Sequence, residues 1–155
     1  MVNNRINVAH RPFRRLLALV AVQCLVSAAC APTPTSPSQF AQYSQTDLRV
    51  GTGDPAVSGN TVGVHYTLWL YDATKAETKG VQLETSRGNS NPFSYRLGAN
   101  QVIQGWERGV PGMQVGGQRR LIVPPDLGYG NTRNGAVPPN ATLVFDIELV
   151  SITTG

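Results

Sequence analysis

The sequence predicts an α+β fold in which a curved, antiparallel sheet wraps one short helix. Three observations favour this class. Apolar residues alternate along two long segments, 61–71 and 142–152, as they do in half-buried strands. Only one segment, 102–110, has the spacing of a helix. All 16 glycines lie at or beyond Gly51, which indicates that the folded part occupies the last two thirds of the 155 residues.

Four segments are expected to be strands. One face of 61–71 is apolar and carries Val62, Val64, Tyr66, Leu68 and Leu70. In 142–152, Asp146 and Glu148 fall on the face opposite to a row formed by Leu143, Phe145, Ile147 and Leu149. Two shorter strands are expected at 93–97 and 118–123, each bounded by Gly or Pro. The polar stretch 72–80 is expected to connect strands in contact with solvent.

The expected helix, 102–110, places Val102, Trp106 and Val110 on one face because these residues are four apart. Gly105 and Gly109 weaken it by about 1 kcal/mol each relative to alanine. The helix is therefore expected to depend on packing against the sheet.

Residues 1–30 are predicted to be a signal peptide for export. A basic start that ends in Arg14 and Arg15 precedes the mostly apolar run 16–29. This run has 14 residues, whereas a helix that spans a bilayer needs roughly 20. Small residues stand at its end, where a signal peptidase cuts.

Cys30 leaves two outcomes of processing open. The sequence from Ser27 to Cys30 resembles the lipobox of bacterial lipoproteins, whose cysteine is acylated after cleavage, although Ser27 stands where leucine is usual. Lipidation would anchor the chain to a membrane, and Ala31 would point to the outer membrane of a Gram-negative envelope. The alternative is ordinary cleavage at Ala29 or Ala31. The Pro/Ser/Thr-rich segment 31–46 is predicted to be a linker to a domain at 47–155.

The charge and cysteine counts exclude several functions for this domain. The net charge of +4 comes from four leader arginines, because the remaining nine Lys and Arg balance nine Asp and Glu. A neutral body disfavours nucleic acid as a partner. Both cysteines, Cys24 and Cys30, lie in the leader, and His65 is the only histidine beyond it. Neither metal nor cofactor is expected, and a hydrolytic triad has no G-x-S-x-G motif to support it.

A series of motifs resembles the FKBP-type peptidyl-prolyl isomerases over residues 47–152. In order, they are Val64-His-Tyr-Thr67, Asn91-Pro-Phe93, Leu97-Gly98, Gln101-Val-Ile-Gln-Gly-Trp-Glu107, Gly109-Val110, Met113-Gln-Val-Gly116, Pro125-Asp-Leu-Gly-Tyr-Gly130 and Val137-Pro-Pro-Asn-Ala-Thr-Leu-Val-Phe-Asp146. The resemblance implies a monomeric isomerase that binds proline-containing polypeptides and macrolides such as rapamycin, here assisting the folding of exported proteins.

The resemblance also implies roles for individual residues. The position of Trp106 forms the floor of a hydrophobic pocket in the family, and Val137 stands at its mouth. The pocket walls correspond to Tyr66, Phe93, Val102, Ile103, Tyr129 and Phe145. The backbone N–H of Ile103 and the hydroxyl of Tyr129 are expected to hold carbonyl groups of the ligand. At Gln101 the family often has an acid, but its backbone carbonyl makes the contact there.

Three departures from the family pattern affect the expected activity. Leu83 and Glu84 replace the usual Phe-Asp, which removes one aromatic wall and lengthens the acid. Asn89 replaces a common arginine partner of that acid, so the Glu84 carboxylate is expected to be free, less well oriented than in the ion pair and turned to solvent. The loop 131–136 is shorter than in some relatives by about one residue. Reduced activity and weakened macrolide binding are expected, and a non-catalytic peptide-binding or chaperone module that uses the same pocket remains the alternative.

Overall fold

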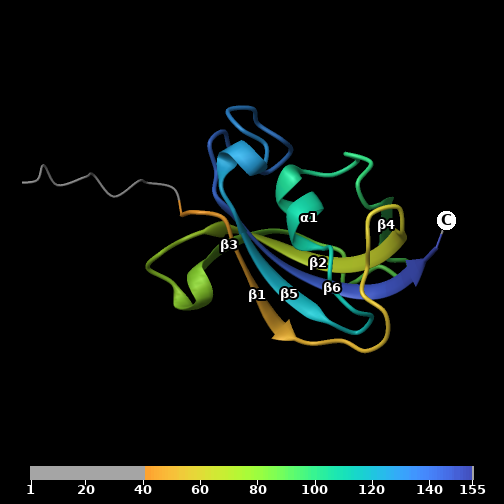
Figure 1. Cartoon of the computed structure of the whole chain (residues 1–155). Coiled ribbons are helices and arrows are strands. Elements are labelled where there is room, and N and C mark those ends of the chain that lie inside the picture. Colours follow the sequence, from red (N-terminus) through yellow and green to blue (C-terminus); the bar gives the residue numbers. More distant parts are fainter. Residues whose placement is uncertain (1–40, 155) are drawn as a thin grey trace, which may run out of the picture. The chain divides into compact units, whose positions relative to one another are not determined.

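The structure is a computed structural model that describes residues 41–154 (Figure 1). The predicted signal peptide, Cys30 and most of the predicted linker lie outside these residues. Among the residues described, no helix has the length and apolar character needed to cross a membrane.

An antiparallel sheet of six strands forms the framework, in the order β1-β5-β6-β2-β3, with β4 paired to β2. The strands are β1 (Ser44–Arg49), β2 (Thr61–Tyr71), β3 (Lys79–Thr85), β4 (Phe93–Arg96), β5 (Gln118–Val123) and β6 (Leu143–Thr153). The helix α1 (Gln104–Gly109) lies over one face of the curved sheet, as Figure 1 shows. Two 3-10 turns, η1 (Ala76–Thr78) and η2 (Pro125–Leu127), complete the elements. The α+β prediction is confirmed.

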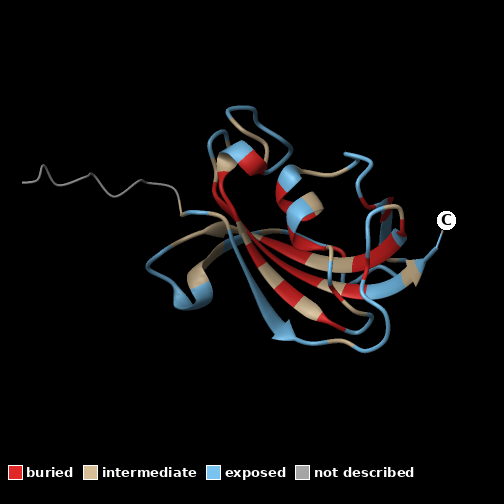
Figure 2. Cartoon of the chain, in the orientation of Figure 1, coloured by how far each residue is buried: buried red, intermediate tan, exposed pale blue. Residues whose placement is uncertain are grey.

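β2 is the central strand of the sheet. It pairs with β6 along most of its length, while its first four residues also pair with β4 and its second half pairs with β3. The alternating pattern of β2 buries Val62, Val64 and Leu68 against the helix side of the sheet. Figure 2 shows the buried residues of β2, β5 and β6 below α1.

The helix is shorter than 102–110, the range that the spacing predicts. It has six residues, and Ile103, directly before it, is extended, with φ −60° and ψ 151°. Val102 and Ile103 therefore form a loop that leads into the helix. Trp106 and Val110 do share a buried face as predicted.

The two glycines of α1 allow it to lie directly on β5. A Cβ atom at Gly105 would stand 2.6 Å from Val123, and one at Gly109 would stand 2.5 Å from Leu121. Glycine thus weakens the isolated helix but permits the close packing on which the helix depends.

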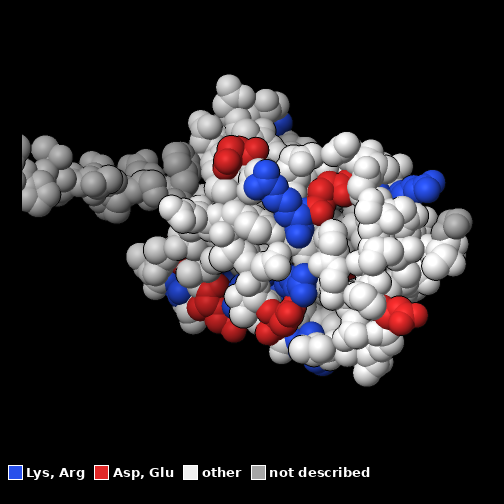
Figure 3. Space-filling model, in the orientation of Figure 1, with Lys and Arg blue, Asp and Glu red and all other residues white. Residues whose placement is uncertain are grey.

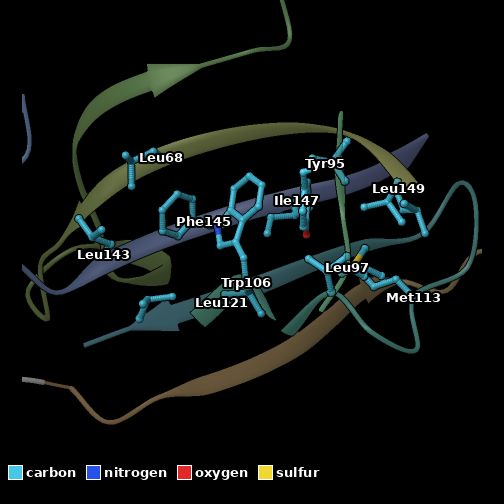
Figure 4. Packing of buried hydrophobic residues seen from close by; sticks show 14 of the residues in the cluster. Leu68, Tyr95, Leu97, Trp106, Met113, Leu121, Leu143, Phe145, Ile147 and Leu149 are labelled. Carbon is cyan, nitrogen blue, oxygen red and sulfur yellow. The ribbon is translucent and has the colours of Figure 1, made fainter. Parts of the chain in front are cut away.

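One hydrophobic core fills the space between the helix and the sheet (Figure 4). Trp106 lies near its centre, between Phe145 and Tyr95, and its ring centroid is 5.4 Å and 5.8 Å from theirs. Because Trp106 is held by side chains from β4 and β6, its position is fixed by the sheet as well as by the helix.

The folded domain begins earlier than residue 47, the predicted boundary. β1 starts at Ser44, which pairs with Ile122 of β5. The Tyr43 hydroxyl donates a hydrogen bond of 3.3 Å to the Gly105 carbonyl oxygen. The polar composition of 41–46 concealed this strand, since β1 lies at the edge of the sheet and all of its residues are exposed.

The face of the sheet opposite the helix is charged. As predicted, Asp146 and Glu148 lie on this face, but Asp146 is only 5% exposed because Arg120 and Lys79 cover it. Glu77 of η1 joins the cluster, 3.0 Å from Lys79 and 3.3 Å from Arg120. The predicted connection 72–80 ends earlier than expected, because Lys79 and Gly80 already belong to β3. Figure 3 shows the surface in the orientation of Figure 1, and there too cations and anions lie next to one another.

Candidate active site

A pocket of about 340 Å³ opens between α1, the sheet, the loop before α1 and the loop after η2. Eleven residues line it: Tyr66, Leu68, Glu84, Phe93, Asn100, Gln101, Val102, Ile103, Trp106, Tyr129 and Phe145. Eight of the ten pocket residues predicted from the sequence are brought together here. The two exceptions are Leu83 and Val137.

Trp106 forms the inner end of the aromatic part of the pocket. Its side chain is only 4% exposed, and its backbone N–H donates to the Ile103 carbonyl oxygen at 2.9 Å. Tyr66 and Phe145 meet it edge to face, with ring centroids at 5.1 Å and 5.4 Å and interplanar angles of 78° and 85°. Such contacts between rings add to the stabilisation from burial. The aromatic surface is therefore fixed before any ligand arrives.

The walls of the pocket come from three strands. Tyr66 projects from β2, Phe145 from β6 and Phe93 from the start of β4, where it pairs with Val64. Phe93 is 44% exposed although its ring lies 6.1 Å from that of Trp106. A large apolar side chain left this exposed beside a cavity provides surface for an apolar ligand.

Glu84 is exposed and forms no ion pair among residues 41–154, as expected, but a hydrogen bond orients its carboxylate. The Tyr66 hydroxyl donates to Glu84 Oε1 at 2.7 Å. This is possible because β2 and β3 are adjacent, with Glu84 paired to Leu68, two residues from Tyr66. Burial, together with the hydrogen bond to Glu84 and its negative charge, raises the pKa of Tyr66, so the phenol remains a donor.

Two hydrogen-bond donors at the pocket are unused within residues 41–154. Neither the backbone N–H of Ile103 nor the hydroxyl of Tyr129 has a hydrogen-bond acceptor among these residues. Burial and, to a smaller extent, the charge of Glu84 raise the pKa of Tyr129, which keeps its hydroxyl protonated. The site can therefore donate to two carbonyl oxygens beside an aromatic surface.

Leu83 and Val137 lie elsewhere. Leu83 is half-buried and packs against the core. It stands at an irregularity of β3, because Glu84 pairs with Leu68 whereas Gln82 pairs with Trp69 and Leu83 is left without a partner. Val137, expected at the mouth, is 5% exposed and belongs to the core cluster. An isolated bridge between Val137 and Asn134 folds the loop back on itself, which turns the valine inward.

Three further residues line the pocket: Leu68 and Asn100, which the sequence did not indicate as site residues, and Gln101, for which the family resemblance implied a contact through its backbone carbonyl. Leu68 lies two residues from Tyr66 and therefore on the same face of β2. This spacing of two is the signal that could have identified it. Asn100 and Gln101 belong to the loop before the helix. The Gln101 carboxamide accepts a hydrogen bond of 2.8 Å from the Arg96 backbone N–H, so this side chain braces the loop. Polar loop residues carry no periodic signal in a sequence.

The potential metal ligands of the domain are scattered over the part of the chain that is described. No group of three or more His, Cys, Asp or Glu side chains gathers within residues 41–154. The Nδ1 atom of His65 lies 3.3 Å from the Ser86 hydroxyl, and His65 does not line the pocket.

Comparisons with known proteins agree on one family. Residues 53–150 match the family model of the FKBP-type peptidyl-prolyl cis-trans isomerases. An FK506-binding protein of Neisseria meningitidis serogroup B is 41% identical over 107 residues, which cover 68% of this chain and 92% of that protein. FK506-binding protein 1 of Aspergillus oryzae is 40% identical over 105 residues, covering 66% and 90%. The crystal structure of FkpA from Escherichia coli matches with a TM-score of 0.61 and 33% identity, over 72% of this chain and 48% of that one.

Proposed function

Since the chain belongs to the family of FKBP-type peptidyl-prolyl cis-trans isomerases, we propose that it catalyses rotation about X–Pro bonds in the aromatic pocket around Trp106. The enzyme class follows from the family, whereas the pocket as the place of reaction is the proposal. The single observation that carries it is the buried indole of Trp106, surrounded by aromatic walls and flanked by two unused donors.

The chemistry requires no nucleophile. An X–Pro bond rotates over a barrier of about 18–20 kcal/mol because rotation destroys amide resonance, and the uncatalysed step takes tens to hundreds of seconds. Water stabilises the planar, charge-separated amide more than the twisted one. An apolar pocket that takes proline out of water therefore favours the twisted state, and each 1.36 kcal/mol of such preference gives about tenfold in rate.

The residues of the pocket have distinct parts in this mechanism. The proline ring would lie on the indole of Trp106 between Tyr66 and Phe145. The Ile103 N–H and the Tyr129 hydroxyl would each donate to a peptide carbonyl oxygen and hold the segment in a turn. Because both donors are unpaired among the described residues, a substrate displaces no internal hydrogen bond when it binds.

An isomerase assay tests the proposal. The full domain should accelerate cis-trans exchange of a Leu-Pro or Phe-Pro peptide in a protease-coupled assay, and rapamycin should inhibit it by occupying the same pocket. Rapamycin binding is expected to be weaker than is usual in the family, because Leu83 supplies no aromatic ring to the pocket. A rate equal to background, from a domain shown to be folded, would instead favour the non-catalytic binding module.

We also propose that the protein acts outside the cytoplasm, on exported or envelope proteins that contain proline. This rests on the leader: the basic start, the apolar run 16–29 and Cys30. Mass spectrometry of the mature protein should find an N-terminal Cys30 that carries lipid. A mature N-terminus beyond Cys30, or an unmodified Cys30, would remove the lipid anchor, and retention of residues 1–15 would remove export.

A further inference from the structure

Glu84 is the one side chain with a formal charge among the eleven that line the pocket. Within residues 41–154 no lysine or arginine forms an ion pair with it. The nearest arginine in sequence, Arg87, pairs instead with Glu148 at 2.7 Å, and the neutral Asn89 follows it. The pocket therefore contains a negative charge that no described cation neutralises.

The Glu84 carboxylate is held in place with one oxygen unused. Oε1 accepts the hydrogen bond from the Tyr66 hydroxyl, and Oε2 has no donor among the described residues. The Glu84 side chain is exposed, whereas Trp106 and Phe145, which line the same pocket, are buried. Its charge also acts across the pocket, since it contributes to the raised pKa of both Tyr66 and Tyr129.

We propose that Glu84 is a specificity-determining residue that favours proline segments with a lysine or arginine beside the proline. This inference rests on the proposed function, because it concerns the substrate of the same site. A cationic side chain near the carboxylate would pair with Oε2, the oxygen that Tyr66 leaves free. Phe93, which is 44% exposed and lines the same pocket, provides an aromatic surface that also attracts cations.

The size of the effect follows from the exposure of the pair. An ion pair at a solvent-exposed rim is weak, but replacing lysine by glutamate exchanges attraction for repulsion, so a preference of about three- to tenfold is expected. The preference should diminish at 1 M salt, where the screening length falls to about 3 Å. The net charge of the domain does not favour cationic peptides, because residues 32–155 are formally neutral.

The test compares peptides that differ only in one residue beside the proline, either before or after it, and carry Lys, Gln or Glu there. Cis-trans exchange measured by NMR needs no protease and gives kcat/KM for each peptide. The wild-type chain should turn over the Lys peptide fastest and the Glu peptide slowest in at least one of the two series. Glu84→Gln retains an acceptor for Tyr66 but removes the charge, so its Lys-to-Glu ratio should fall to about one.

Asp126→Asn is the matched control, because Asp126 is an exposed carboxylate on the neighbouring turn η2 that does not line the pocket. It should keep the wild-type ratio. A wild-type Lys-to-Glu ratio of kcat/KM near one, or a ratio that Glu84→Gln leaves unchanged, overturns the inference. In either case, turnover of the Leu-Pro peptide would leave the proposed function intact. If no peptide is turned over, calorimetric dissociation constants for the same Lys and Glu peptides decide the inference independently.

Discussion

Replacing Trp106 with alanine is expected to lower kcat/KM for a Leu-Pro peptide by about 100-fold, because the variant loses the surface on which proline is desolvated. The same change removes a side chain that is 4% exposed and contacts four other rings. The free energy of unfolding should therefore fall by about 3–5 kcal/mol. Chemical denaturation measures the stability loss, and the peptide assay measures the loss of activity.

Two further variants separate the pocket from general stability. Leu149→Ala empties a fully buried core position that does not line the pocket, so it should cost stability, about 2–5 kcal/mol, without loss of turnover while the domain is folded. Tyr129→Phe removes a hydroxyl with no described partner and should leave the stability within about 0.5 kcal/mol while lowering turnover. Equal loss of activity in Trp106→Ala and Leu149→Ala, measured on folded protein, would contradict the assignment of Trp106.

The sequence predicts those elements of the fold that have one apolar face. Apolar and polar residues alternate over many positions in β2 and β6, so the sequence predicts both strands, and both are present. β1 was missed because it is an exposed edge strand whose residues are mostly polar. Its place depends on pairing with β5 and on the Arg119 to Asp47 ion pair, neither of which leaves a periodic signal.

Motifs in the sequence predict which residues form the site, but they do not predict how each side chain is oriented. Trp106, Tyr129 and Phe145 stand in recognisable motifs, and the structure places all three in the pocket. The orientation of Glu84 depends on the register between β2 and β3, which brings Glu84 next to Tyr66. No local pattern in the sequence encodes this register. The backbone of Ile103 is extended because this residue precedes the helix. The helix is therefore shorter than the range 102–110 that the spacing of apolar residues predicts.

Asp146→Ala is expected to reduce the free energy of unfolding by about 3 kcal/mol at neutral pH, since it leaves two partly buried cations with only the exposed Glu77 as a partner. Arg120 donates to both Asp146 oxygens, Nε to Oδ1 at 2.7 Å and Nη2 to Oδ2 at 3.0 Å, and Lys79 Nζ lies 2.7 Å from Oδ2. Glu148→Gln is the control on the same strand and face. It loses two arginine partners whose side chains are 56% and 41% exposed, and should cost about 1 kcal/mol or less.

The pKa of Asp146 determines how the difference in stability between the wild type and Asp146→Ala depends on pH. Burial works to raise the pKa of Asp146, but hydrogen bonds from Arg120 and Lys79 outweigh it, so the pKa is lowered in the folded state. A lowered folded-state pKa contributes stability above the unfolded value of about 3.9, and this contribution disappears as the pH falls through the folded value. Urea denaturation from pH 7 to pH 2 should therefore show the wild-type advantage over Asp146→Ala constant down to about pH 5 and shrinking below pH 4. An advantage that is unchanged at pH 2 would mean that the side chain stabilises the sheet through packing, because a protonated Asp146 retains its volume but not its charge.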